Sequence, residues 1–283
     1  MKPKDIKLKM VKASIIISFY ARIDYLRLLF AGFERQTLKD FEIIIADDGS
    51  KEEVVLEIEK LARGASFPVI HLWHEDKGFR KNKILNRAIA ASNSDYLIFV
   101  DGDCVPHSSF VEEHFMNRRM RTCLAGRRVN LSEKITKMLS YESVKNGFLE
   151  RKLPLLIWDG IFGKSFDVEK GFYFKSPAIR NFFNTKKRGI VGCNFSLNKK
   201  DFISINGFDE RYEKPSIGED SDVQFRLELE DVNIKSINHM AVQYHLYHVL
   251  QARPQENLEL FSKIKESKLS FTPCGIIKSA SNF

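Results

Sequence analysis

The most informative part of the chain reads Leu97-Ile98-Phe99-Val100-Asp101-Gly102-Asp103-Cys104-Val105-Pro106. Its four leading apolar residues predict a buried strand. Because side chains two apart in an extended chain point the same way, Asp101 and Asp103 can reach one point beyond the strand. Two carboxylates suit Mg²⁺ or Mn²⁺, which usually share their shell with substrate phosphates. Gly102 would let a phosphate approach the backbone, and Pro106 should end the sheet. The alternative is an ordinary surface turn, where Asp and Gly are common.

The length and the cysteines set the broad class of protein. The chain has 283 residues, 43% of them hydrophobic, which is enough for one large α/β domain or one domain with an added lobe. Its four cysteines form no C-x-x-C pair and predict reduced thiols in a cytoplasmic protein; they are Cys104, Cys123, Cys193 and Cys274.

The N-terminal residues and the net charge restrict the location and the partners. Residues 1–12 are a basic extension without an apolar stretch, and no apolar run reaches the length of a membrane span, so we expect neither a signal peptide nor an anchor. The formal net charge of +8 suits a nucleic acid, an anionic membrane surface at its inner face, or a phosphorylated substrate. Nucleic acid is not predicted, since no motif of interleaved aromatic and basic residues appears.

Strands and helices alternate in the first third of the chain. Apolar runs predict strands at 13–18, 41–46, 69–73 and 96–100, and helical spacing predicts helices at 24–35, 52–63 and 82–91, the second capped by Ser50. This alternation predicts an α/β fold with a mostly parallel sheet and helices on both faces. In such sheets ligands bind outside the carboxyl ends of the strands.

Polar loops follow all four predicted strands, at 18–20, 47–50, 76–83 and 101–103. In the third loop Arg80, Lys81 and Lys83 begin a helix, where their charges and the free backbone N–H groups could meet a diphosphate. The alternative is a solvated basic helix face.

These motifs, in this order, resemble the nucleotide-sugar half of the GT-A glycosyltransferases, family 2 in particular. The resemblance implies a Rossmann-like nucleotide-sugar domain that binds a UDP-sugar, with Asp48 near the uracil and ribose, and Asp101 and Asp103 at the ribose and the metal-bound diphosphate. It also implies a loop and helix at 78–86 over the donor. The donor-binding residues expected on these grounds are Ser18, Tyr20, Asp48, Gly78, Phe79, Arg80, Lys83, Asp101 and Gly102.

The middle of the chain carries weaker signals. We expect a helix at 111–120, a strand at 125–130, and a helix over 132–151 whose apolar stripe slips once and contains Gly147. Residues 162–188 are rich in Phe, Lys, Gly and Asn, which indicates a mobile or acceptor-facing segment. Their basic, aromatic character equally suits contact with an anionic leaflet.

The signal returns with a strand at 189–197 and a short helix at 199–206, which Gly207 should end. Gly218-Glu219-Asp220-Ser221-Asp222 then precedes a helix at 223–229. Acidic residues are stabilised at a helix N-terminus by the dipole, which is the structural explanation of this cluster.

This block resembles the C-terminal catalytic part of β-1,4-galactosyltransferases and bacterial chondroitin-type polymerases. In those enzymes the carboxylate matching Asp220 is the general base, and the one matching Glu219 helps to hold the acceptor. Residues 213–217 depart from the Trp-Gly-rich stretch of the galactosyltransferases, which leaves the identity of the acceptor open but not that of the base.

The run at 241–248 is strand-like and contains His245 and His248. In a regular strand the two imidazoles would point to opposite faces, but they can converge if the chain bends after Leu246. The resemblance implies that His248 completes the metal shell and that His245 is a second, weaker ligand. A shell of Asp, His and diphosphate fits Mn²⁺ better than Mg²⁺. A helix is expected at 255–265.

We therefore expect one GT-A domain made of a basic extension (1–12), a nucleotide-sugar half (13–106), a variable segment (107–188), an acceptor half with a smaller lobe (189–261) and a tail (262–283). The expected activity is the inverting, metal-dependent transfer of a sugar from a UDP-sugar to a saccharide or lipid-linked saccharide, as in surface polysaccharide synthesis. The rivals are a nucleotidyltransferase, which should have a glycine in the first loop, and a non-catalytic nucleotide-sugar-binding subunit.

Overall fold

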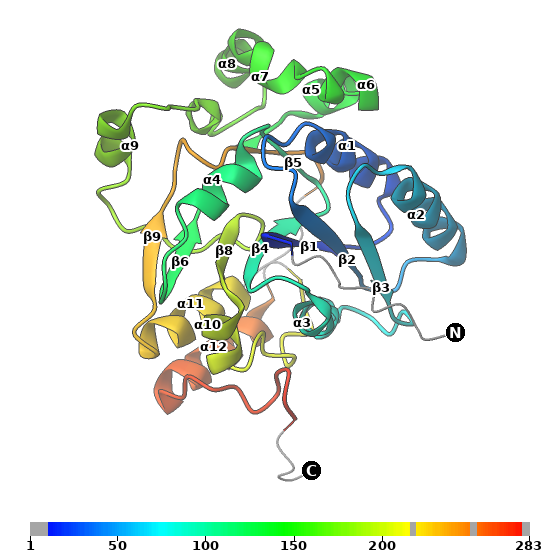
Figure 1. The fold of residues 1–283 in the computed structure, drawn as a ribbon. Coiled ribbons are helices and arrows are strands. Elements are labelled where there is room, and N and C mark those ends of the chain that lie inside the picture. The colour runs from blue at the N-terminus through cyan, green and yellow to red at the C-terminus, as the bar shows by residue number, and fades with distance from the viewer. Residues whose placement is uncertain (1–10, 216–218, 250–253, 279–283) are drawn as a thin grey trace, which may run out of the picture.

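The fold is built on a seven-stranded sheet of order β3-β2-β1-β4-β8-β6-β9 (Figure 1). A computed structural model describes residues 11–215, 219–249 and 254–278. Only β8 runs antiparallel to its neighbours β4 and β6, so the expected mostly parallel α/β sheet is confirmed. The strands are β1 Ala13–Phe19, β2 Phe41–Asp47, β3 Val69–Trp73, β4 Tyr96–Asp101, β6 Thr122–Ala125, β8 Phe195–Asn198 and β9 Asn233–Ser236.

Helices cover both faces of this sheet because alternate strand residues point to opposite sides. Ile15 and Ile43 pack with α1 (Ile23–Glu34), α2 (Glu52–Gly64) and α4 (Phe110–Met116). The next residues along, Ile16 and Ile44, pack with α3, α10 and α11. The helices on this second side are α3 Lys81–Ala91, α10 Lys199–Ser204 and α11 Glu219–Leu229, and α12 Gln255–Ser267 packs against α11.

A second, three-stranded sheet of order β5-β10-β7 supports the middle of the chain. It consists of β5 (Cys104–Pro106), β10 (Gln243–His245) and β7 (Val129–Asn130). Pro106 ends β5, although the chain has already left the main sheet after Asp101. Short helices pack on this small sheet through a separate apolar core; they are α5 Glu133–Lys137, α6 Tyr141–Lys145, α7 Phe148–Arg151 and α8 Leu153–Phe162.

Several element predictions for the second half were wrong in extent. The helix expected over 132–151 is three helices, because Ser132 and Ser140 each cap a new one and Gly147 adopts φ +78°. The strand expected at 189–197 is confined to β8, and that at 125–130 is split between β6 and β7. Residues 162–188 contain a 3₁₀ turn at Val168–Gly171 and α9 at Pro177–Phe183.

Ser50 and Gly207 were expected to cap the start of α2 and the end of α10, and only Gly207 does so. Ser50 does not cap α2: its hydroxyl donates to Asp47 Oδ1 (2.6 Å) and accepts from the Ala21 amide, so it ties the loop after β2 to the loop after β1. Gly207 follows α10 at φ +75°, and its amide donates to Phe202 O, as a C-terminal cap requires. Within the described ranges, no helix is both long and apolar enough to cross a bilayer.

Candidate active site

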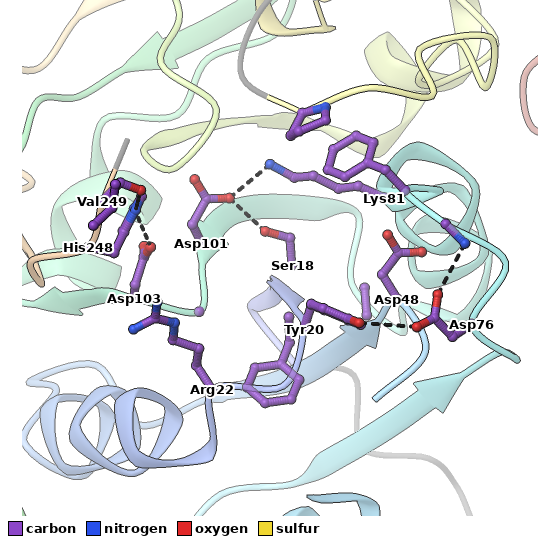
Figure 2. Close-up of a pocket in the computed structure, with 16 residues that line it drawn as sticks. Ser18, Tyr20, Arg22, Asp48, Asp76, Lys81, Asp101, Asp103, His248 and Val249 are labelled. Atoms are coloured by element: carbon purple, nitrogen blue, oxygen red, sulfur yellow. Dashed lines mark hydrogen bonds and ion pairs between the residues drawn. The ribbon is translucent and has the colours of Figure 1, made fainter. Parts of the chain in front are cut away.

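A cavity of about 500 Å³ opens at the carboxyl ends of β1, β2 and β4 (Figure 2). This volume is in the usual range for small-molecule sites. Segments far apart in the sequence meet there, because the ends of parallel strands share one edge. Its lining residues are Ser18, Phe19, Tyr20, Arg22, Ala46, Asp48, Asp76, Gly78, Phe79, Lys81, Asp101, Gly102, Asp103, Pro215, His248 and Val249.

Asp48 is fixed at one end of the cavity. One carboxylate oxygen lies 2.7 Å from His74 Nε2, and the other accepts the backbone N–H of Arg80 at 2.9 Å. Burial raises the pKa of Asp48, although the bonds from His74 and Arg80 oppose that shift. Nearby, the Tyr20 hydroxyl donates to Asp76 Oδ2 (3.1 Å), which links the loops after β1 and β3 (Figure 2).

Asp101 lies at the centre of a charged cluster. Its Oδ1 accepts from the Ser18 hydroxyl at 2.6 Å and from the Lys81 ammonium at 3.1 Å. Lys81 is also 3.8 Å from Glu219 Oε1. Burial lowers the pKa of Lys81, but the carboxylates of Asp101 and Glu219 outweigh it and keep the lysine charged. Lys81 therefore joins the strand that carries Asp101 to the helix that carries Glu219.

Gly102 is needed for the packing of the chain after β4 against the end of β1. Its amide donates to Ser18 O (2.8 Å), and a Cβ there would lie 3.0 Å from that oxygen and 3.1 Å from the Phe19 ring. The close contact between the ends of β4 and β1 therefore favours glycine.

Asp103, His245 and His248 bring three possible ligand atoms to one point. Asp103 Oδ2 lies 3.2 Å from His248 Nε2 and 3.5 Å from His245 Nε2, and the two Nε2 atoms are 3.1 Å apart. β10 ends at His245, and beyond it the two imidazoles converge, as the sequence required for them to share a ligand site. Burial raises the pKa of Asp103, but the bonds from both histidines outweigh it and hold that pKa well below its usual range.

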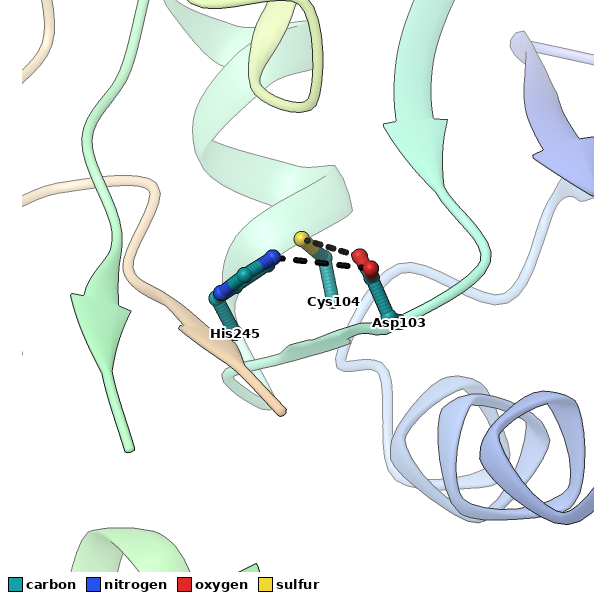
Figure 3. Close-up of side chains that lie close together, drawn as sticks. All are labelled: Asp103, Cys104 and His245. Atoms are coloured by element: carbon teal, nitrogen blue, oxygen red, sulfur yellow. Dashed lines mark hydrogen bonds and ion pairs between the residues drawn. The ribbon is translucent and has the colours of Figure 1, made fainter. Parts of the chain in front are cut away.

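Cys104 supports this group from the buried side (Figure 3). Its thiol donates to Asp103 Oδ1 at 3.3 Å, and Cys104 pairs with His245 across β5 and β10. Asp103, Cys104 and His245 lie close enough to share an ion. Burial raises the pKa of Cys104, so in the metal-free protein it is a neutral thiol that donates to Asp103. As expected, all four cysteines are free.

Glu219 and Asp220 begin α11 and line a small adjoining pocket with Ser18, Lys81 and Asp101. Asp220 accepts the amides of Ser221 (2.8 Å) and Gly192 (3.3 Å). Burial raises the pKa of Glu219, and its Oε2 has no hydrogen-bond partner among the described residues. Both carboxylates thus stand beside the cavity.

Besides Glu219 and Asp220, which line the small adjoining pocket, three predicted residues do not line the main cavity. His245 is buried behind Asp103 and His248. Arg80 contributes its backbone amide to Asp48, while its guanidinium donates to Glu75 O. Lys83 is exposed on α3 and does not face the cavity.

The structure adds lining residues that the sequence prediction did not select: Arg22, Asp76, Pro215 and Val249. Lys81 belongs to the predicted basic helix start but not to the predicted donor-binding residues. Its spacing was a usable signal, because Leu85 and Ala88 lie four and seven positions on and face the core, so Lys81 is on the inward side of α3. Arg22 and Val249 gave no such signal.

The sheet, with aspartates at its carboxyl edge, has the architecture of a GT-A glycosyltransferase. The profile of Glycosyl transferase family 2 matches residues 14–202, and the chain belongs to this family. The profile described as the N-terminal domain of galactosyltransferase matches residues 178–249. Family membership favours a transferase over the nucleotidyltransferase and the binding subunit.

Three similar proteins are bacterial. The chain is 26% identical to chondroitin synthase of Escherichia coli over 82% of its length and 34% of that protein. It is 32% identical to cholesterol galactosyltransferase of Borreliella burgdorferi over 36% of its length and 27% of that protein. The chain therefore spans about a third of these relatives. The crystal structure of S. aureus TarS aligns over 89% of this chain and 39% of that chain with TM-score 0.55 and 15% identity, which shows a shared fold.

Proposed function

We propose that the protein is an inverting, metal-dependent glycosyltransferase that moves a sugar from a UDP-sugar to a saccharide hydroxyl in glycan synthesis. The observation that carries the proposal is the meeting of Asp103 and His248, which are 3.2 Å apart at the cavity although 145 positions (248 minus 103) separate them in the chain. The likeness of residues 178–249 to a galactosyltransferase domain supports it independently.

The donor would occupy the main cavity. Asp48 is held by His74 and Arg80 with its carboxylate beside the cavity, where it would accept N–H or O–H groups of the uridine. Tyr20 is 54% exposed and can stack on a base. Lys81 and Arg22 supply positive charge toward the diphosphate. A saccharide acceptor, either free or linked to lipid, would approach from the side of α11.

The residues present fit a divalent ion. Ligands about 2.1 Å from an ion and at right angles to each other are about 3.0 Å apart, close to the separations among Asp103 Oδ2, His245 Nε2 and His248 Nε2. His248 Nδ1 lies 3.0 Å from Val249 O, which fixes the ring so that Nε2 faces Asp103. One carboxylate and two imidazoles suit Mn²⁺ better than Mg²⁺. When bound, the ion would neutralise the charge on the leaving diphosphate.

Asp220 is the proposed base. The acceptor oxygen attacks the anomeric carbon, the bond to the diphosphate oxygen breaks, and the hydroxyl proton passes to Asp220. The amides of Ser221 and Gly192 orient its carboxylate. Glu219 would hold the acceptor through its unpartnered Oε2. One base without a covalent intermediate gives inversion at the anomeric carbon.

A screen of UDP-sugars with Mn²⁺ by thermal shift tests the donor, followed by UDP release with saccharide acceptors. A rise in melting temperature that needs both nucleotide and metal is expected, together with a product of inverted configuration. Equal shifts with UDP-sugars and with GDP-sugars would contradict the donor assignment, and a retained configuration would contradict the mechanism.

A further inference from the structure

Two short helices in the middle of the chain expose apolar side chains where a helix usually exposes polar ones. On α8, Trp158 and Phe162 are 63% and 68% exposed, and Ile161 between them is 66% exposed. On α9, Phe182 is 74% exposed. The spacing of Trp158, Ile161 and Phe162 puts them on one face of the helix. The ring centroids of Trp158 and Phe162 are 4.3 Å apart. We call the three side chains of α8 the apolar face.

The apolar face is held outward by contacts on the other side of α8. Leu156 is fully buried in the core that contains Val129 and Tyr244 of the three-stranded sheet. Asp159, the one acidic residue of α8, points inward and accepts from the amide and hydroxyl of Ser165. The outer surface of α8 therefore lacks carboxylates. A rotation of α8 that buried the apolar face would expose Leu156 and break the hydrogen bonds of Asp159.

Lysines stand at both ends of both helices. Lys152 and Lys164 flank α8, and Lys175 and Lys186 flank α9. All four are exposed, and none forms an ion pair with a residue that the structure describes. Residues 151–188 contain nine Lys or Arg against three Asp or Glu, a net +6 out of the chain's +8. Two of those acids are engaged: Asp159 is buried and Asp167 pairs with Lys170 at 2.5 Å.

From this arrangement we infer that α8 and α9 dock the protein on the surface of an anionic lipid bilayer. Apolar rings can enter the boundary between headgroups and acyl chains, while flanking lysines reach the phosphates through their flexible stems. Both helices project from the same end of the molecule in Figure 1, away from α12. Net positive charge beside an apolar face fits this surface better than a second copy of the chain, whose equally basic segment would repel it.

Docking through this surface is independent of the transfer reaction proposed above. The three-stranded sheet does connect the two, because β10 contributes Tyr244 to the core under α8 and ends at His245. A docked protein would thus hold its cavity at a fixed height above the bilayer, where an acceptor linked to lipid could be reached.

The test uses sucrose-loaded vesicles of phosphatidylcholine with or without phosphatidylglycerol, and co-sedimentation of the whole chain. We expect binding only to the anionic vesicles, weakened by salt. Trp158→Ser/Phe162→Ser should abolish it, whereas Leu269→Ser/Ile277→Ser, which changes apolar side chains of similar exposure (61% and 58%) near the C-terminus, should leave it intact. Lys152→Gln/Lys164→Gln should weaken binding about 25-fold, roughly fivefold per lysine, and Lys51→Gln/Lys200→Gln should not.

Tryptophan fluorescence reports insertion of Trp158 into the bilayer, and a misfolded variant would not give the same lipid-dependent change. The chain has two tryptophans, Trp73 and Trp158. In a Trp73→Phe variant, the emission of Trp158 should shift to the blue on addition of anionic vesicles and be quenched by brominated acyl chains. Equal binding to neutral vesicles, full binding by Trp158→Ser/Phe162→Ser, or an unshifted emission would overturn the proposal. A wild-type dimer that the same double variant dissociates, without vesicle binding, would do so as well.

Discussion

Removal of the Lys81 ammonium should destabilise the fold through the carboxylates that it leaves behind. In Lys81→Met, Asp101 and Glu219 lose a cation that is 3.1 Å and 3.8 Å away. Breaking a fully buried pair by removing one partner costs about 3–5 kcal/mol. Because these side chains are 14–26% exposed, we expect the lower end, about 3 kcal/mol, or roughly 6 °C in melting temperature.

The pH dependence of this loss has a definite sign. Without Lys81, the folded-state pKa values of both carboxyls rise above their unfolded values. A group with a raised folded pKa contributes stability below its unfolded pKa that is lost as the pH rises. The loss of stability of Lys81→Met relative to the wild type should therefore become smaller as the pH is lowered from about 8 to about 5. Asp101→Asn in the Lys81→Met background should recover part of the stability, since it removes one unpaired charge.

Urea unfolding followed by circular dichroism, repeated across this pH range, measures the effect. Lys83→Met is the matched control, because Lys83 is exposed on the same helix and should change the stability by less than about 0.5 kcal/mol. If Lys81→Met is as stable as the control at neutral pH, or if its deficit grows on acidification, the electrostatic account of this cluster is wrong.

Three further predictions concern the base, the metal group and the core. Asp220→Asn should keep UDP-sugar affinity and lower turnover by about 10²–10⁴; turnover near that of the wild type would exclude Asp220 as the base. His248→Ala should weaken Mn²⁺ binding in calorimetry more than it lowers the metal-free melting temperature, whereas an equally large loss of melting temperature without metal would mark His248 as structural. Burial lowers the pKa of His114 to about 3. The unfolded chain therefore binds the extra proton at a higher pH than the folded protein does, and the free energy of unfolding should fall as the pH drops from about 6.5 toward 3. His114→Gln should reduce the slope of stability against pH in this range, and an unchanged slope would show that His114 is not the cause.

The first half of the fold was predictable because its signals are local and agree with one another. Each apolar run of β1 to β4 is followed by polar residues, and parallel strands bring those residues to one edge whatever the details of the loops. Asp48, Asp101 and Asp103 could therefore be placed together from the sequence. The face of α3 that turns inward was equally readable from Leu85 and Ala88, which would have favoured Lys81 over Lys83.

The second half depended on contacts that the sequence does not display. Residues 189–194 end in a turn closed by the Asn194 amide on Val191 O, and the fully buried Asn194 side chain donates to Arg127 O and Ala241 O from two other segments. The convergence of His245 and His248 depends on the path of the chain after β10, where the Leu246 amide donates to Asp103 O and the Tyr247 amide donates to Thr136 Oγ1. The breaks at Ser140 and Gly147 were visible as a serine cap and a glycine, but periodicity alone did not rank them above a continuous helix.

The central claim is that Asp103, His245 and His248 hold one divalent ion for a nucleotide diphosphate. Calorimetry of UDP binding with and without Mn²⁺, on the wild type and on Asp103→Ala, tests it most directly. Mn²⁺ should strengthen UDP binding to the wild type, and Asp103→Ala should abolish this dependence. The same UDP affinity in both proteins, with or without Mn²⁺, would contradict it.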